Sequence, residues 1–316
     1  MRVTTEPSKP RFGAKEIAFV AVPLLFVASL WVVPESLFLV AYASGRAGAC
    51  PLKQTVFVRQ AVNELNRTTA EIASQSTVEL KEPNGGLWRW NTPYGIFFAP
   101  PETSVPFLLS EQATRIYGDG SRRVRKDDVV LDCGANVGAF TREALNAGAK
   151  LVIAIEPSAR NVEALRRTFA QEIQQERVIV YPKGIWDRDG MLKFYVYENS
   201  ALDSFVLAQR VEENKKPREE TVEVETIDRI VDELKLKRID FIKMDVEGAE
   251  RNAVEGAQQT LAKFHPRMAI ALENLPDDQY VVPPLVEQAW SGYRQECGRC
   301  TLAPNGLVQP DVMFFY

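Results

Sequence analysis

The segment around residue 132 combines a carboxylate with a glycine-rich turn, a pattern typical of ligand-binding sites in α/β proteins. Asp132 follows the apolar, β-branched run 129–131, which has the composition of a buried parallel strand. Gly134, Asn136 and Gly138 come next at alternate positions, and a helical pattern begins directly afterwards. Glycine lets the backbone approach a ligand, and asparagine is one of the few other residues that tolerate a left-handed conformation. This order of strand, turn and helix predicts a pocket for a nucleotide-like ligand.

A second carboxylate, Glu156, ends the apolar run 151–155. It lies close to the roughly 20-residue offset at which a carboxylate binds a ribose diol. Asp132 precedes the first glycine by two residues, where it would repel the pyrophosphate of a nicotinamide cofactor. The same charge suits a ligand that carries an ammonium and a sulfonium group. The two carboxylates therefore favour S-adenosylmethionine.

A third acidic strand end follows residues 241–244, which are predicted to form another buried strand, and Asp245 is expected at the edge of the sheet that binds ligands. Glu247 and Glu250 then open a predicted helix with an apolar stripe. Acidic residues in a first helical turn stabilise the helix dipole, which is a structural explanation for these two. Asp245 belongs to the strand end and has no such explanation, so we expect it beside the ligand.

Five segments, in order along the chain, resemble the FkbM family of S-adenosylmethionine-dependent methyltransferases. They are VLDCGANVGAFT at 130–141, AIEPS at 154–158, ETIDRI at 225–230, DFIKMDVEGAE at 240–250 and ALEN at 271–274. The resemblance implies a class I methyltransferase fold, which is Rossmann-like, α/β and doubly wound around a mostly parallel sheet. It also implies transfer of a methyl group to oxygen, usually on a sugar or polyketide hydroxyl. Cys133 stands where a small aliphatic residue is commoner, and we expect its side chain to face away from the ligand.

The resemblance and the strand ends together assign the site residues. The predicted cofactor-binding residues are Asp132, Gly134, Asn136, Gly138, Glu156 and Asp187. Asp187 is expected near the adenine amino group, although a carboxylate in a loop can also be simply solvated. Asp245 is the first candidate to remove the proton of the acceptor hydroxyl, with Glu247 and Glu273 as alternatives. A divalent cation on these three carboxylates is a further possibility, because all would be hard oxygen ligands.

Composition limits the remaining functions. The chain has 316 residues, a formal net charge of −4 and one histidine. The chain has no basic run long enough to suggest a nucleic-acid partner. The single histidine excludes a metal site rich in histidine. His265, before a proline, is expected to be structural. The pair Cys297 and Cys300 is half of a zinc site, so we interpret it as a turn with reduced thiols.

The N-terminus predicts a membrane anchor. After a basic tail at 1–15, residues 17–33 carry no charge, and a second apolar stretch follows the pair Pro34 and Glu35. Residues 16–44 are long enough to cross a bilayer, and a cleaved signal peptide is the alternative. The positive-inside rule places the N-terminus in the cytoplasm, which would export the following domain. Because S-adenosylmethionine is a cytoplasmic metabolite, we expect instead a domain that faces the cytoplasm, with a kinked hairpin as one way to achieve this.

Residues 45–120 are expected to form a separate helical and hairpin region before the methyltransferase domain at 121–316. A helix over 54–74 has an apolar seam that either packs on the domain or forms a homodimer. The aromatic hairpin over 87–99 is either cross-strand packing or an acceptor platform. Core strands are predicted at 129–131, 151–155, 178–181, 241–244 and 269–272, with helices at 140–147, 159–174, 227–234 and 249–264. Added strands are predicted at 192–196 and 204–207, a solvated loop at 212–220, and two strands in the tail at 293–316.

Two other functions stay open from the sequence. The first is an NAD(P)-dependent oxidoreductase on the same fold, and the second is a metabolite-binding or scaffold protein at a membrane. The acceptor is expected to be a sugar, a glycan, a lipid-linked saccharide or a secondary metabolite, and fold analogy cannot choose among them.

Overall fold

The computed structural model describes residues 35–83, 86–197, 203–205, 217–303 and 308–316. Its centre is a sheet of seven strands in the order β12-β15-β11-β10-β4-β5-β6. Only β15 among them runs antiparallel to its neighbours, β11 and β12. The strands are β4 (Val129–Cys133), β5 (Leu151–Ile155), β6 (Val178–Tyr181), β10 (Phe241–Met244), β11 (Arg267–Ala271), β12 (Gln295–Cys297) and β15 (Val312–Phe315). The predicted α/β fold with a mostly parallel sheet is confirmed.

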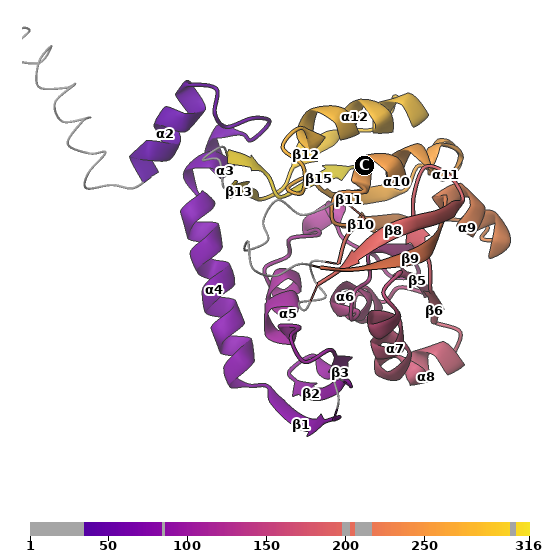
Figure 1. Ribbon diagram of the computed structural model, residues 1–316. Helices are drawn as coiled ribbons and strands as arrows, with labels where there is room; N and C mark the ends of the chain where they lie inside the picture. Colours follow the sequence, from indigo (N-terminus) through magenta and orange to yellow (C-terminus); the bar gives the residue numbers. More distant parts are fainter. Residues whose placement is uncertain (1–34, 84–85, 198–202, 206–216, 304–307) are drawn as a thin grey trace, which may run out of the picture.

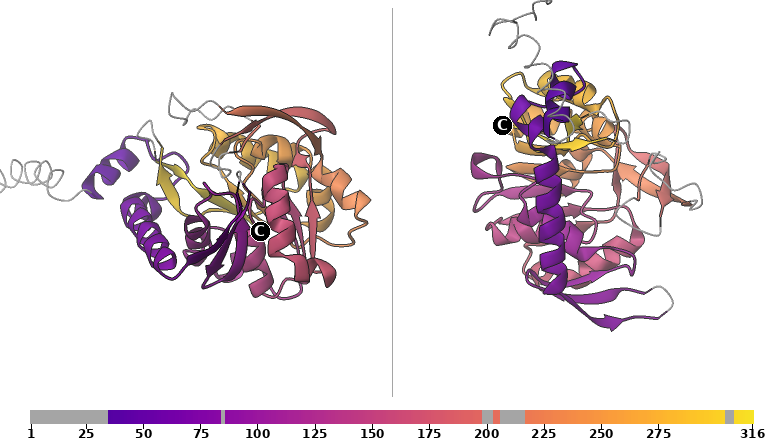
Figure 2. Two further views of the ribbon diagram at one scale, coloured as in Figure 1. Left: turned by 60° about the horizontal axis from the view of Figure 1, so that its bottom comes forward. Right: turned by 90° about the vertical axis from the view of Figure 1, so that its left-hand side faces the viewer.

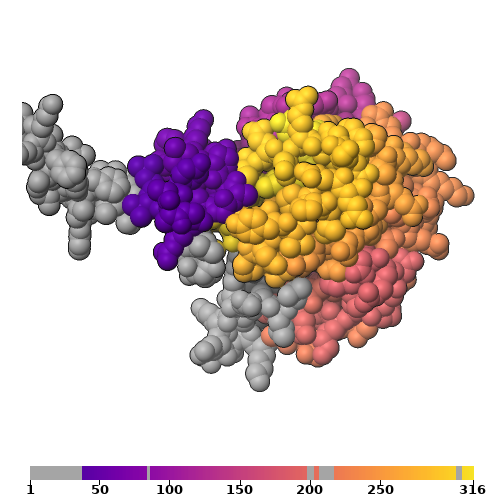
Figure 3. Space-filling view, turned by 90° about the horizontal axis from the view of Figure 1, so that it is seen from above, coloured from indigo at the N-terminus to yellow at the C-terminus, as the bar shows by residue number. Residues whose placement is uncertain are grey.

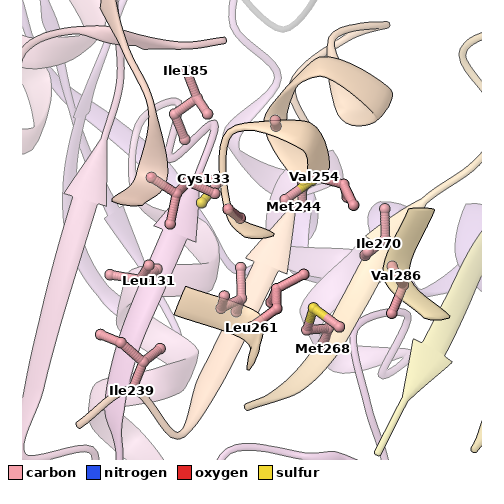
Figure 4. Packing of buried hydrophobic residues seen from close by; sticks show 14 of the residues in the cluster. Leu131, Cys133, Ile185, Ile239, Met244, Val254, Leu261, Met268, Ile270 and Val286 are labelled. Carbon is pink, nitrogen blue, oxygen red and sulfur yellow. The ribbon is translucent and has the colours of Figure 1, made fainter. Parts of the chain in front are cut away.

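Helices cover both faces of this sheet (Figure 1). They are α6 (Ala139–Asn146), α7 (Ala159–Thr168), α8 (Ala170–Gln174), α9 (Ile227–Glu233), α10 (Glu250–Glu255), α11 (Gln258–Phe264) and α12 (Asp278–Ala289). Alternate residues of each strand face opposite layers: Leu131 packs in the cluster of α9 to α12, and Val130 packs in the cluster of α6 and α7. Figure 4 shows the first of these clusters, in which Leu131, Met244 and Ile270 face the helical residues Val254, Leu261 and Val286. Cys133 lies in the same apolar layer, as expected.

The strand order reverses between β4 and β10. Strand β4 starts one half of the sheet, and β10 starts the other half. In open α/β sheets, ligands bind at the carboxyl ends of the strands beside such a reversal. Asp132 on β4 and Asp245 directly after β10 therefore flank the position at which a ligand is expected.

A second layer before β4 covers one side of the domain. It contains α3 (Leu52–Val56), α4 (Val58–Ser74) and α5 (Val105–Ala113), with a small sheet of β1 (Thr77–Lys81), β2 (Trp88–Thr92) and β3 (Gly95–Ala99). Figure 2 shows α4 lying along the side of the molecule. The seam residues Val58, Leu65 and Ile72 are buried in the chain's own clusters. The seam therefore packs on the domain rather than forming a dimer.

The aromatic hairpin β2–β3 packs in the same way. Phe97 is fully buried, and Lys81 covers the ring of Trp88 at 4.3 Å. Phe98 Nα donates a hydrogen bond to Thr168 on α7. None of the hairpin's residues lines the main cavity described below, so the structure favours cross-strand packing over an acceptor platform.

Several predicted elements differ from the structure. The helix predicted at 159–174 is interrupted at Phe169, and the helix at 249–264 is interrupted at Gly256 and Ala257. Part of the loop predicted at 212–220 belongs to strand β9 (Arg218–Glu225), which pairs with β7 (Gly184–Ile185) and β8 (Gly190–Val196). Helix α12 was not predicted, because Pro283 and Pro284 lie inside it.

The C-terminal tail contains more strands than the two predicted. Besides β12 and β15, it contains the pair β13 (Cys300–Leu302) and β14 (Val308–Pro310). Ser204 makes a bridge to Tyr195 instead of starting a strand, and residues 206–207 lie outside the described residues.

A disulfide joins Cys50 to Cys300, which corrects the prediction of reduced thiols in the tail. The Cys297 thiol is free, and it donates to the carbonyl of Ala49 at 3.0 Å. Figure 3 shows the N-terminal part of the described chain, in indigo, beside the C-terminal part, in yellow. This pairing was not predicted from the sequence, because no local pattern connects two cysteines that are 250 residues apart.

The predicted membrane anchor at 16–44 lies mostly outside the described residues. Its described end is helix α2 (Glu35–Ala43). In the part of the chain that the structure describes, no helix has the length and apolar character needed to cross a bilayer. The anchor therefore stays a prediction from the sequence.

Candidate active site

A cavity of about 320 Å³ lies where the carboxyl ends of β4, β5 and β10 meet. Its size is within the usual range for small-molecule sites. Residues from the turn after β4, from the end of β5 and from the segment after β10 line one continuous space, together with residues of α5. The cavity is therefore at the strand-order reversal at which a ligand was expected.

The turn after β4 is fixed by backbone geometry. Gly134 has a φ of 75°, and a Cβ atom there would collide with the carbonyl oxygen of Asp245. Only glycine combines this conformation with that close approach. Asn136 also has a positive φ, of 51°, and its Nα donates a 2.9 Å hydrogen bond to Glu156 Oε2. The turn and the end of β5 are thus held together by one carboxylate, and Gly134, Asn136 and Glu156 all line the cavity.

Glu156 is 5% exposed and accepts further hydrogen bonds at Oε1. The donors are Ser158 Nα at 2.9 Å and Asn161 Nδ2 at 3.3 Å. Burial raises the pKa of Glu156 to about 7, although these donors oppose the shift. Near neutral pH the group can therefore gain or lose a proton when a ligand binds.

Asp132 lies beneath the cavity rather than in its wall, since it is fully buried and does not line the space. Thr141 Oγ1 donates to its carboxylate at 2.6 Å, and Lys243 Nζ lies 3.6 Å away. Burial raises the pKa of Asp132, and the charge of Lys243 opposes that shift. Asp132 is therefore positioned to hold Lys243 and the turn, not to touch a ligand directly.

Lys243 connects the two halves of the site. It is 4% exposed, and its ammonium group donates to the carbonyl of Gly134 at 2.8 Å. It also lies 3.9 Å from Asp245 Oδ2. Burial lowers the pKa of Lys243, but the charges of Asp132 and Asp245 outweigh burial, so the pKa is raised overall. This lysine was missed from the sequence, although a charge inside the apolar run 241–244 is the signal that could have indicated it.

Asp245 lies in the cavity wall with two partners. The hydroxyl of Tyr117 donates to Asp245 Oδ2 at 2.7 Å, and Lys243 supplies positive charge nearby. Burial, followed by the neighbouring Asp245, raises the pKa of Tyr117, so the phenol keeps its proton. The carboxylate thus has one hydroxyl donor that fixes its orientation and one positive charge close by.

The segment after β10 is shaped by another buried acid. Glu250 is fully buried and accepts hydrogen bonds from Val246 Nα and Gly248 Nα, both at 2.9 Å. It caps this turn, and it accepts a third hydrogen bond from Asn274 Nδ2. Glu247, with a φ of 51°, is presented by the turn and lines the cavity.

Glu273 and Glu111 complete the acidic wall. Glu273 follows β11, as the sequence predicted, whereas Glu111 is on α5 and was not predicted. Burial raises the pKa of Glu111 well above its usual value, and the charges of Asp245 and Glu273 add to this effect. The charges of Asp245 and Glu273 are therefore close enough to favour the protonated form of Glu111.

The remaining predicted residues are elsewhere. Gly138 does not line the cavity, and a Cβ there would collide with the ring of Phe169, so this glycine serves helix packing. Asp187 is also outside the cavity, and it accepts a 2.7 Å hydrogen bond from Asn252. Its predicted contact with adenine therefore has no support from its position. Asp203, which was not predicted, lines the cavity instead, and burial raises its pKa to about 6.

The described wall of the cavity is acidic. It contains six carboxyl groups, from Glu111, Glu156, Asp203, Asp245, Glu247 and Glu273. Two lysines, Lys183 and Lys243, are its described cations, and Lys183 is paired with Glu223 and Glu225. An excess of carboxylates attracts a cationic ligand and repels a pyrophosphate. The residues present thus fit S-adenosylmethionine better than a nicotinamide dinucleotide.

A metal site is not apparent at these carboxylates. Across the described residues, no group of three or more histidine, cysteine, aspartate or glutamate side chains is arranged to hold a metal ion. Asp245, Glu247 and Glu273 share the cavity without converging on one point, so the divalent cation considered from the sequence gains no support.

Comparison with known proteins agrees with this site. The model of the methyltransferase FkbM domain matches residues 132–296. The 2-O-methyltransferase NoeI of Sinorhizobium fredii is 27% identical over 151 residues, which cover 44% of this chain and 61% of that protein. The chain thus matches less than two thirds of that relative's length.

Solved structures give remoter likenesses. A crystal structure of methyltransferase FkbM from Methylobacillus flagellatus KT has a TM-score of 0.45 at 16% identity, covering 82% of this chain and 60% of that one. Precorrin-6y C5,15-methyltransferase from Geobacter metallireducens GS-15 has a TM-score of 0.34 at 13% identity, covering 65% and 84%. The family model covers more than half of the sequence and includes the acidic strand ends Glu156, Asp245 and Glu273 of the site, so this chain belongs to the FkbM methyltransferase family.

Proposed function

We propose that this chain is an S-adenosylmethionine-dependent O-methyltransferase that acts on a hydroxyl of a sugar, a glycan, a lipid-linked saccharide or a secondary metabolite. The observation that supports it most directly is a single cavity in which the turn after β4 faces the acidic segment after β10. One side can hold a cofactor, and the other can accept a proton. Methyl transfer to oxygen requires both within one space.

The cofactor side is formed by Gly134, Asn136 and Glu156. Three protein donors leave Glu156 one of its about four acceptor positions, at Oε2. The residue lines the cavity, so it can accept a hydrogen bond from a ribose hydroxyl. When bound, S-adenosylmethionine supplies an electrophilic methyl group on a positively charged sulfur. The acidic wall favours binding of that positive charge.

The proton side centres on Asp245. Its carboxylate accepts the proton of the acceptor hydroxyl as the new carbon–oxygen bond forms and the carbon–sulfur bond breaks. Tyr117 fixes the orientation of this carboxylate through its 2.7 Å hydrogen bond, and Lys243 supplies a positive charge 3.9 Å away. Glu247 and Glu273, in the same wall, are placed to orient the acceptor.

Two questions about the compartment of this reaction stay proposals: whether the chain is attached to a membrane, and on which side of it the domain lies. The apolar N-terminus supports attachment to a membrane, with an acceptor at that surface. The Cys50–Cys300 disulfide, however, argues against a domain that faces the cytoplasm, because disulfides persist in oxidising compartments. The distribution of positive charge before residue 16 agrees with the disulfide.

The first test is calorimetric titration of S-adenosylmethionine into the full chain, beside Glu156→Gln and the exposed control Glu255→Gln. We expect saturable binding that is weakened by Glu156→Gln alone. Transfer of labelled methyl from the cofactor to a panel of sugars, with an alkali-stable ether as product, then tests the acceptor class. A folded chain that binds NADH but not S-adenosylmethionine would refute the proposal.

A further inference from the structure

A second cavity, of about 550 Å³, lies beside the first. It runs along α6, from Phe140 to Ala147, and its other wall is the segment between α5 and β4. Four of its described lining residues are cationic, namely Arg115, Arg123, Arg125 and Lys126. We call it the basic groove.

The charges of the basic groove are not neutralised by the chain. None of its four cations lies within 4.0 Å of a carboxylate among the described residues, although many other arginines do form such pairs. Glu143 is the single described acid in its wall, and the charges of Arg115 and Arg123 act on it from a distance. In a chain with a net charge of −4, four cations against one acid in the described wall are a local reversal of sign.

The rest of the lining suits a polar ligand. Gln112 and Asn146 contribute amide groups, and the aromatic rings of Tyr117 and Phe140 give flat surfaces. Guanidinium groups bind phosphate and sulfate through paired hydrogen bonds. The chemistry of the groove therefore matches an oxyanion carried on a polar molecule.

The basic groove is adjacent to the proposed active site and shares a wall with it. Gln112, Tyr117 and Phe140 line both cavities. Tyr117 is also the residue that orients Asp245. A molecule held in the groove thus lies against the residues that position the proposed proton acceptor.

We propose that the basic groove binds a sulfate or phosphate ester carried by the acceptor, so that the preferred substrate is an anionic saccharide. This inference rests on the proposed function. Each cavity then binds the group of opposite charge: the acidic cavity holds the cationic cofactor, and the basic groove holds the anionic end of the acceptor. Such a division also keeps the acceptor's anion away from the carboxylates of the active site.

The test uses a sulfated tetrasaccharide and its unsulfated counterpart as probes, titrated into the full chain. Arg123→Glu and, separately, Lys126→Glu reverse one charge in the groove. Arg166→Glu reverses the charge of an exposed arginine on α7 that does not line the groove. Binding of S-adenosylmethionine is measured for every variant.

We expect the sulfated probe to bind the wild-type chain more tightly than the unsulfated one, and more weakly as ionic strength rises. Each groove variant should weaken this binding about tenfold, as expected for the loss of one charge-assisted contact. Arg166→Glu should bind like the wild type, and affinity for S-adenosylmethionine should be unchanged in all three variants.

Several results would overturn the inference. Equal weakening by Arg166→Glu would mean that overall charge, not the groove, attracts the probe. A loss of S-adenosylmethionine affinity in Arg123→Glu would assign the groove to the cofactor's carboxylate. Groove-dependent binding of vesicles that contain phosphatidylserine, without binding of the tetrasaccharide, would assign it to a membrane surface. If the wild-type chain binds the probe but never S-adenosylmethionine, the proposed function fails, and with it the acceptor role of the groove.

Discussion

The Tyr117 hydroxyl donates a 2.7 Å hydrogen bond to the carboxylate of Asp245, although 128 residues separate them in the sequence. Tyr117 follows α5 in the layer before the sheet, and Asp245 follows the central strand β10. The contact therefore joins the N-terminal layer to the proposed site of proton transfer. It gives the layer a chemical role in addition to its role in packing.

Replacement of Tyr117 by phenylalanine should separate these roles. The ring and its edge-on contact with Phe140 remain, so stability should change by only about 1 kcal/mol, the usual net value of one hydrogen bond. The carboxylate loses its fixed orientation, and kcat should fall about 10- to 100-fold. Affinity for S-adenosylmethionine should not change. Steady-state kinetics and calorimetry measure the two quantities.

Tyr280→Phe is the matched control, because Tyr280 is 60% exposed and lies outside both cavities. A Tyr117→Phe variant with the kcat of the control would show that Asp245 needs no orienting partner.

The buried pair of Lys243 and Asp132 predicts a large effect on stability. Lys243→Met leaves the Asp132 carboxylate in an apolar interior without its cation, and breaking a buried pair in this way costs about 3–5 kcal/mol. Since burial already raises the pKa of Asp132, the variant should lose more stability as pH rises, when that carboxyl must ionise. Urea unfolding at several pH values measures this loss.

Two further variants test the explanation. Adding Asp132→Asn to Lys243→Met should recover part of the stability, because position 132 then carries no uncompensated buried charge. Lys193→Met removes an exposed pair with Glu219 and should leave stability almost unchanged. If Lys193→Met and Lys243→Met lowered the free energy of unfolding equally, burial of the Lys243–Asp132 pair would not explain the loss.

The raised pKa of Glu156 predicts that cofactor binding depends on pH. The free protein holds a proton on this carboxyl below a pKa of about 7. Only in the ionised form does the carboxylate keep an acceptor position for a ribose hydroxyl beside its three protein contacts. Affinity for S-adenosylmethionine should therefore rise with pH through this value, by about tenfold between pH 6 and pH 8 for a single titrating group. Calorimetry in buffers of different ionisation enthalpy should also detect release of the proton.

In Glu156→Gln the affinity should be low and almost independent of pH over the same interval. Should the wild type bind equally well at pH 6 and pH 8, Glu156 would not be the group that binds the ribose.

The sequence predicted best those features that depend on short segments. Strands β5, β6 and β10 have the predicted bounds. β5 and β6 are short unbroken apolar runs, and in β10 a single lysine interrupts an otherwise apolar segment. Gly134 and Asn136 were placed in the cavity wall because their backbone conformations are local properties. The strand ends Glu156, Asp245 and Glu273 followed from the rule that parallel strands present their carboxyl ends at one edge.

The parts that were missed depend on contacts between distant segments. Tyr117 and Glu111 reach the cavity from a helical layer whose position no local pattern specifies. Asp132 has the right spacing for a ligand contact, yet Lys243 holds it beneath the cavity. The interruptions at Phe169 and Gly256 show the same limit, because the fit of helices against the sheet, not helix propensity, decides where each helix ends.

The disulfide between Cys50 and Cys300 predicts a stability that depends on redox conditions. It ties the segment before α3 to strand β13, with 250 residues between the two cysteines. Because it restricts the unfolded chain over this distance, its reduction should lower the free energy of unfolding by about 2–5 kcal/mol.

Under denaturing conditions without reductant, two free thiols should be titrated, from Cys133 and Cys297. The double variant Cys50→Ser and Cys300→Ser should have the stability of the reduced wild type and should not respond further to reductant. Four free thiols in the protein isolated from its native cells would instead support the cytoplasmic orientation. The thiol count therefore tests the covalent link and the compartment together.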